Sequence, residues 1–182
     1  SQGQPMQLAA RLSGPVSAPA FKLETPTGEP VATVPMYDAG TLGDYSAGDQ
    51  VSNYTDPATG LPVFSIYGKT RKPTREMLEG IDVLVYDIQD IGSRSYTYIS
   101  SLGLAMEAAA ENNIPFVVLD RPNPLGGEKM EGMITRPGFF SFVSQFPIPY
   151  IHGLTVGELA RFLNDEKLLS NGVQCKLQVI PV

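Results

Sequence analysis

Length, composition and charge limit the classes of protein to which this chain can belong. Its 182 residues suit a single domain with a hydrophobic core, and 42% of them are hydrophobic, as in an ordinary globular protein. The formal net charge of −6 argues against a nucleic-acid partner, because proteins that bind phosphate backbones usually present a basic face.

Few side chains in the sequence favour metal ions or cofactors. The single cysteine, Cys175, and the single histidine, His152, exclude an internal disulfide and zinc sites built from several such residues. The pair Gly126–Gly127 fits no nucleotide-binding pattern. We therefore expect no metal and no cofactor, and we expect Cys175 to be a buried thiol. No apolar run reaches the length needed to cross a bilayer.

The N-terminal third of the chain carries weak structural signals. Residues 1–20 are rich in Gln, Gly, Pro, Ser and Ala, which predicts a flexible arm. Residues 31–36 could form a strand that Pro35 confines to the edge of a sheet. Glycine, proline, Asp and Asn dominate residues 37–62, which indicates a long functional loop.

The remaining chain alternates between the apolar patterns of strands and helices. The expected elements are strands at 61–68, 82–88, 114–120 and 176–182, and helices at 73–80, 96–112 and 156–164. The last helix should begin at a capping box formed by Thr155 and Glu158. This alternation predicts an α/β fold: a three-layer domain with a mostly parallel sheet of about five strands.

Polar side chains follow two of the expected strands, where each strand ends. The strands end at Asp87 and Asp120, which should emerge at the same edge of a parallel sheet, the usual place for a ligand. The groups that follow them are Gln89, Asp90 and Arg94 in one loop, and Arg121 and Asn123 in the other. Carboxylate, amide and guanidinium groups together suit the paired donors and acceptors of a sugar.

The same residues also have structural interpretations. An Asp at the end of a strand often caps the helix or turn that follows, and Asp90 with Arg94 could be a structural ion pair. His152 could bind a ligand or close the loop before the helix at 156–164. These alternatives stay open at the level of the sequence.

Longer motifs resemble one known family. They are SIYGKTRKPT (65–74), YDIQDIGSRSYTY (86–98), LDRPNP (119–124) and HGLTVGELA (152–160). Over residues 43–182 the chain resembles the bacterial exo-β-N-acetylmuramidase family, once a domain of unknown function. The resemblance implies a Rossmann-like domain over residues 21–182, truncated because the family's smaller C-terminal domain is absent, with the active cleft between the two.

The resemblance also implies a substrate and site residues. Family members release N-acetylmuramic acid from the non-reducing ends of peptidoglycan fragments, using a glutamate that is followed by a histidine. Here Asp38 stands at the glutamate position and Ala39 at the histidine. The second catalytic group would be Glu131, Asp87 or Tyr67.

The remaining polar groups would bind the substrate. Arg94 or Arg121 would pair with the lactyl carboxylate of the sugar, because only a cation stabilises that group in a crevice. The other implied contacts are a stacking face from Tyr67, Tyr96 and Tyr98, and polar contacts from Asp87, Gln89, Asp90, Asp120, Asn123 and His152.

Three interpretations of the chain follow from this resemblance. The first is a glycoside hydrolase acting on a muropeptide or a disaccharide of N-acetylmuramic acid and N-acetylglucosamine, with an extracytoplasmic location implied by the family. The second is a non-catalytic or vestigial muropeptide-binding domain that lacks the catalytic glutamate and the C-terminal domain. The third is a fragment of a longer protein, whose C-terminal domain or a partner would complete the cleft.

Overall fold

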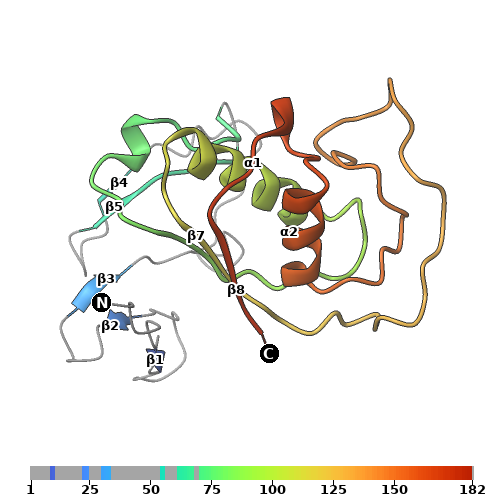
Figure 1. The fold of residues 1–182 in the computed structure, drawn as a ribbon, viewed down its shortest axis with the longest axis horizontal. Helices are drawn as coiled ribbons and strands as arrows, with labels where there is room; N and C mark the ends of the chain where they lie inside the picture. The colour runs from blue at the N-terminus through green and yellow to red at the C-terminus, as the bar shows by residue number, and fades with distance from the viewer. Residues whose placement is uncertain are drawn as a thin grey trace. The chain divides into compact units, whose positions relative to one another are not determined.

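The structure is a computed structural model that describes residues 61–67 and 70–181, together with short strands nearer the N-terminus (Figure 1). The chain divides into two compact units, Ser1–Asp49 and Gln50–Val182. The first unit contains an antiparallel sheet in the order β1-β2-β3, formed by β1 (Ala9–Ala10), β2 (Lys22–Glu24) and β3 (Pro30–Thr33).

The strand expected at 31–36 is therefore present as β3, at the edge of this small sheet. Its first residue, Pro30, lies opposite Glu24, where the register shifts. Proline has no N–H to donate to the ladder, so an irregularity at this position is expected. Of the expected arm over 1–20, the structure describes only the two residues of β1.

The second unit is built on a parallel sheet in the order β6-β7-β8. Its elements are β6 (Leu84–Tyr86), α1 (Tyr98–Glu111), β7 (Phe116–Leu119), α2 (Val156–Asp165) and β8 (Leu177–Ile180). Helix α1 links the first two strands and α2 the last two. The helices contact each other, and α2 also packs on β7 and β8 (Figure 1). The expected α/β fold with a parallel sheet is confirmed.

The stretch 61–68 does not join this sheet. It contributes only β5 (Pro62–Val63), which pairs antiparallel with β4 (Tyr54–Thr55). Pro62 lacks the N–H that a central strand needs, which is a physical reason for the short pairing. In the described residues the parallel sheet thus has three strands, where the sequence predicts about five.

Two short 3₁₀ helices complete the unit. The helix expected at 73–80 is η1 (Glu76–Leu78), and Gly80 follows it with a φ of 76°, a value that favours glycine. The second, η2 (Ser170–Gly172), is tied to α1 because the Ser170 N–H donates to the buried carboxylate of Glu107 at 2.8 Å. No helix in the described part of the chain is both long and apolar enough to span a bilayer.

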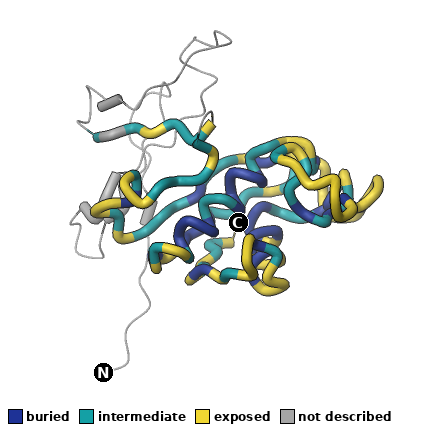
Figure 2. The backbone as a smooth tube through the Cα atoms, turned by 90° about the horizontal axis from the view of Figure 1, so that it is seen from above, coloured by how far each residue is buried: buried dark blue, intermediate teal, exposed yellow. Residues whose placement is uncertain are grey.

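The core lies between the helices and the parallel sheet, where Figure 2 shows a run of buried backbone. The predicted apolar stripe of α1 is buried: Leu102 and Met106 are fully inaccessible, and Ile99 nearly so. Cys175 is buried just before β8, as expected, and burial raises the pKa of its thiol to about 11.

The start of α2 is fixed to the end of β7 by side-chain hydrogen bonds. The predicted capping box is formed: the Glu158 N–H donates to Thr155 Oγ1 at 3.1 Å, and the Thr155 N–H donates to the Glu158 carboxylate at 2.9 Å. Asp120 adds a second cap, because its carboxylate accepts from the Gly157 N–H at 2.7 Å and from the Thr155 hydroxyl at 2.8 Å. The capping alternative for Asp120 is therefore realised.

The connection from 121 to 154, between β7 and α2, forms no helix and no named strand. It extends at the right of Figure 1, and much of it is exposed in Figure 2. Its exposed large hydrophobic side chains are those of Leu125, Met130, Met133, Ile134, Phe139, Phe140, Val143 and Tyr150. A loop of this length in a compact unit favours a functional role.

The close contact between Gly103 and Phe146 gives a test of the core. A Cβ on Gly103, in the middle of α1, would overlap the ring of Phe146, which is 2% exposed. We expect Gly103→Ala to lower the free energy of unfolding by about 1–3 kcal/mol, measured by urea denaturation. Adding Phe146→Leu should offset part of the loss. A more stable Gly103→Ala variant, as helix propensity alone predicts, would contradict this packing.

Asp120 gives a second test. Asp120→Ala removes the acceptor for the Gly157 N–H and the Thr155 hydroxyl, so we expect the free energy of unfolding to fall by about 1–3 kcal/mol. Glu158→Ala, which removes only one half of the capping box, should cost less than about 1 kcal/mol. Thermal unfolding of both variants checks the order. Equal stability of Asp120→Ala and the parent chain would leave Asp120 without a structural role.

Candidate functional site

The candidate site lies at the carboxyl edge of the parallel sheet. The loop that follows β6 and the connection that follows β7 both begin at this edge. Their first polar groups bind each other: Arg121 Nε donates to Asp87 Oδ1 at 2.8 Å, and Arg121 Nη2 contacts the same oxygen. The Asp87 side chain is only 7% exposed. The two residues thus form an ion pair that links the loops.

Asp90 and His152 form a second link, and both are buried. The Leu154 N–H donates to His152 Nδ1 at 3.3 Å, so we assign the proton to Nε2, which lies 3.2 Å from Asp90 Oδ2. The same carboxylate oxygen accepts from the Gly92 N–H at 2.8 Å. His152 therefore closes the loop before α2, and the predicted alternative of an Asp90–Arg94 ion pair is wrong, because Asp90 is bonded to histidine instead.

The amide side chains also connect the loops to each other. Gln89 Nε2 donates to the Pro122 carbonyl at 3.0 Å, and Asn123 Nδ2 donates to the Leu154 carbonyl at 2.9 Å. A Cβ on Gly92, whose φ is 81°, would meet the Asn123 side chain at less than 3 Å. The polar groups expected at this edge are brought together, but several of them bond the protein's own backbone.

A small ladder links Glu131, through Ile151, to the loop after β6. Isolated antiparallel bridges join Ser93 to Ile151 and Ile151 to Glu131. Arg94 is drawn into the same arrangement, because its N–H donates to the Tyr150 carbonyl at 2.8 Å. The side chain of Glu131 is exposed. Of the carboxylates predicted for catalysis, Glu131 is thus accessible, whereas Asp38 lies outside the described residues.

The three tyrosines predicted to form a stacking face make two ring contacts. Tyr96 and Tyr98 meet edge to face, with ring centroids 4.8 Å apart, and Tyr96 is 37% exposed. Tyr67 packs edge-on against Phe142 at 5.9 Å and is 55% exposed. The contact with Phe142 places Tyr67 beside the 121–154 connection, while the other two tyrosines belong to the start of α1.

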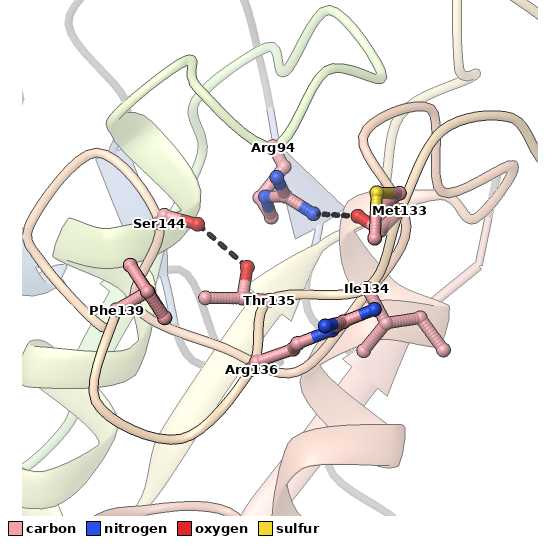
Figure 3. Close-up of a pocket in the computed structure, with 7 residues that line it drawn as sticks. All are labelled: Arg94, Met133, Ile134, Thr135, Arg136, Phe139 and Ser144. Carbon is pink, nitrogen blue, oxygen red and sulfur yellow. Dashed lines mark hydrogen bonds between the residues drawn. The ribbon is translucent and has the colours of Figure 1, made fainter.

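A cavity of about 300 Å³ opens beside Arg94 (Figure 3). Its lining residues are Arg94, Met133, Ile134, Thr135, Arg136, Phe139 and Ser144. Arg94 Nη1 donates to the carbonyls of Met133 and Ile148, at 2.5 and 2.7 Å. The hydroxyls of Thr135 and Ser144 lie 2.6 Å apart. The cavity therefore offers a guanidinium held in place, two hydroxyls and apolar walls.

Most residues of this cavity are not predicted by any pattern in the sequence. Arg136, Thr135 and Ser144 lie in a stretch without helical or strand periodicity, so no pattern placed them near Arg94. The sequence does show apolar residues, including Phe139, in this stretch without periodicity; in the structure Phe139 is 75% exposed.

Tyr150 is a further residue that sequence reasoning missed. Its hydroxyl lies 3.0 Å from Ser95 Oγ, and Arg94 lies over its ring at 5.7 Å from the centroid. Hydrogen bonds from Ser95 and Ser93 lower the pKa of the Tyr150 phenol from its ordinary value, and the Arg94 charge adds to this.

Within the described residues, no three His, Cys, Asp or Glu side chains are grouped to hold a metal ion.

Two solved structures resemble this one. Both are DUF1343 family proteins from Bacteroides fragilis. The first is 65% identical, with a TM-score of 0.67 over 73% of this chain and 34% of its own. The second is 40% identical, with a TM-score of 0.63 over 69% of this chain and 34% of its own.

Sequence comparison identifies a relative and a family. A protein from Bacillus subtilis (strain 168) named peptidoglycan beta-N-acetylmuramidase NamZ is 58% identical over 127 residues, which are 70% of this chain and 31% of that protein. The chain thus spans about a third of the length of the relatives it matches. The model of the family described as "Exo-beta-N-acetylmuramidase NamZ, N-terminal" matches residues 25–182, so the chain belongs to that family.

Proposed function

We propose that this chain forms the N-terminal part of a glycoside hydrolase that releases N-acetylmuramic acid from the non-reducing ends of peptidoglycan fragments. The observation that carries the proposal is the 58% identity to the Bacillus subtilis protein named as a peptidoglycan beta-N-acetylmuramidase. The geometry is compatible with a sugar, because the 300 Å³ cavity falls within the range of small-molecule sites and combines apolar walls with a few fixed polar groups.

The proposed mechanism uses two carboxyl groups. An acid, assigned to Asp38 by its position in the sequence, protonates the leaving oxygen while a second group stabilises or attacks the oxocarbenium-like centre. Among the candidates, Glu131 suits the second role best, because its side chain is exposed and its backbone pairs with Ile151, which in turn pairs with Ser93. Asp87 is nearly buried and already paired with Arg121, and Tyr67 packs against Phe142.

The proposed substrate also implies a location and a partner. Peptidoglycan fragments arise outside the cytoplasmic membrane, so we propose an extracytoplasmic location for the protein. Because the chain spans 31% of the length of the Bacillus relative, we also propose that a further domain or a partner completes the site.

One observation favours a second function. Asp38 and Ala39 stand where the resemblance implies a glutamate followed by a histidine. Aspartate is one methylene shorter, and a displacement of about 1 Å can cost on the order of a hundredfold in rate. The alternative is therefore a domain that binds muropeptides without cleaving them.

Restoring the glutamate tests these alternatives. With para-nitrophenyl β-N-acetylmuramide as substrate, we expect Asp38→Glu to raise kcat by up to about a hundredfold, because the longer side chain restores the reach of the acid. Asp38→Asn should abolish turnover. Release of nitrophenol is the measurement, with a binding titration of N-acetylmuramic acid alongside. Binding without turnover in all three proteins would establish the non-catalytic alternative.

Glu131 gives an independent test of the mechanism. We expect Glu131→Gln to lower kcat about a hundredfold or more with little change in KM, because a catalytic carboxylate acts mainly on the transition state. Glu128→Gln is the matched control, since Glu128 is an exposed glutamate of the same connection. If both variants retain the activity of the parent, Glu131 is not the second catalytic group.

A further inference from the structure

The 300 Å³ cavity carries an unusual charge for this chain. Two of its lining residues, Arg94 and Arg136, are cationic, and no lining residue is acidic. The chain as a whole has a formal net charge of −6. In the described residues neither arginine forms an ion pair, whereas Arg121 is paired with Asp87. A cavity with two uncompensated guanidinium groups favours an anionic ligand.

Arg94 is held in position before any ligand arrives. Its Nη1 donates to the carbonyls of Met133 and Ile148, and its backbone N–H donates to the Tyr150 carbonyl. Its Nε is buried and has no hydrogen-bond partner in the described structure. Because Arg94 is already ordered, a ligand loses little entropy in fixing it.

The remaining lining fits the rest of a sugar. The hydroxyls of Thr135 and Ser144, 2.6 Å apart, can exchange hydrogen bonds with ring hydroxyls. Met133, Ile134 and Phe139 are exposed apolar groups that can cover the hydrophobic face of a pyranose or a methyl group. Figure 3 shows the Thr135 side chain between Arg94 and Arg136 in that view.

We propose that Arg94 and Arg136 form the subsite that recognises the lactyl carboxylate of a muramic sugar, and that they set the preference for this sugar over neutral N-acetylhexosamines. This inference rests on the proposed function and assigns the specificity to a particular pair of residues. It replaces Arg121, which the sequence analysis offered as an alternative, because that guanidinium already binds Asp87.

The test is a calorimetric titration of the chain with three ligands: N-acetylmuramic acid, its methyl ester and N-acetylglucosamine. The ester keeps the lactyl group but removes its charge. The parent chain should bind the acid about tenfold to a hundredfold more tightly than the ester, as expected for a charge-assisted hydrogen bond. Arg136→Gln should weaken binding of the acid about tenfold and leave binding of the ester unchanged.

Two further variants serve as controls. Arg136→Lys keeps the charge but loses the planar fork, so it should retain part of the preference. Arg161→Gln removes an exposed arginine from α2 and should change neither affinity. Arg136 is exposed and makes no ion pair in the described residues, so its variants should fold.

The outcomes separate this inference from the proposed function. Equal binding of acid and ester, or a preference that survives Arg136→Gln, would overturn the subsite while leaving the hydrolase proposal standing. Selective binding of the acid that depends on Arg136 supports the subsite, even if no turnover is detected. If none of the three sugars binds, the subsite is overturned, because both of its arginines are on this chain; the hydrolase proposal is then decided separately by the release of nitrophenol.

Discussion

The arrangement of the site depends on the buried contact between Asp90 and His152. The two side chains are 5% and 1% exposed, and each would lose a hydrogen-bond partner if the other were removed. Through this contact the loop after β6 is fixed to the segment that leads into α2. Two further contacts join the same two segments: the bridge from Ser93 to Ile151, and the hydrogen bond from the Arg94 N–H to the Tyr150 carbonyl.

The polar residues of the two connections that leave the carboxyl edge of the sheet have two uses, and the structure separates them. Irregular loops lack a ladder to satisfy their backbone groups, so side chains must supply donors and acceptors. Gln89 and Asn123 donate to backbone carbonyls, and Asp120 accepts from the first turn of α2. Arg94 and Glu131 differ, because one lines a cavity and the other is exposed. The chemistry that would suit a sugar is therefore used first to build the edge of the sheet, and only part of it faces outward.

The sequence predicted the parallel sheet, its two connecting helices and the capping box of Thr155, because buried apolar runs and caps are local signals. It could not decide what Asp120 does, since a cap and a ligand contact need the same residue at the same strand end. The strand predicted at 61–68 was too long, because only Pro62–Val63 form a strand there. The short apolar pattern favoured a strand, although Pro62 has no N–H to donate to a ladder. Arg136 was out of reach for a different reason. Its position beside Arg94 depends on the path of a connection without periodic structure, and that path is set by contacts far apart in the sequence.

The irregular connection at 121–154 is long for a binding site. When a ligand must order such a loop, the loss of conformational entropy lowers the affinity. Three kinds of contact reduce that cost here. Bridges on both sides of Ile151 hold the returning backbone, and the paired hydroxyls of Thr135 and Ser144 join two parts of the connection. Arg94 Nη1 donates to two carbonyls far apart in the connection, those of Met133 and Ile148. Arg94 thus contributes to the fold and to the charge of the cavity at once. Because it organises the loop through its own hydrogen bonds, its positive charge is already oriented, and the proposed discrimination between charged and neutral sugars would require no large rearrangement of the backbone.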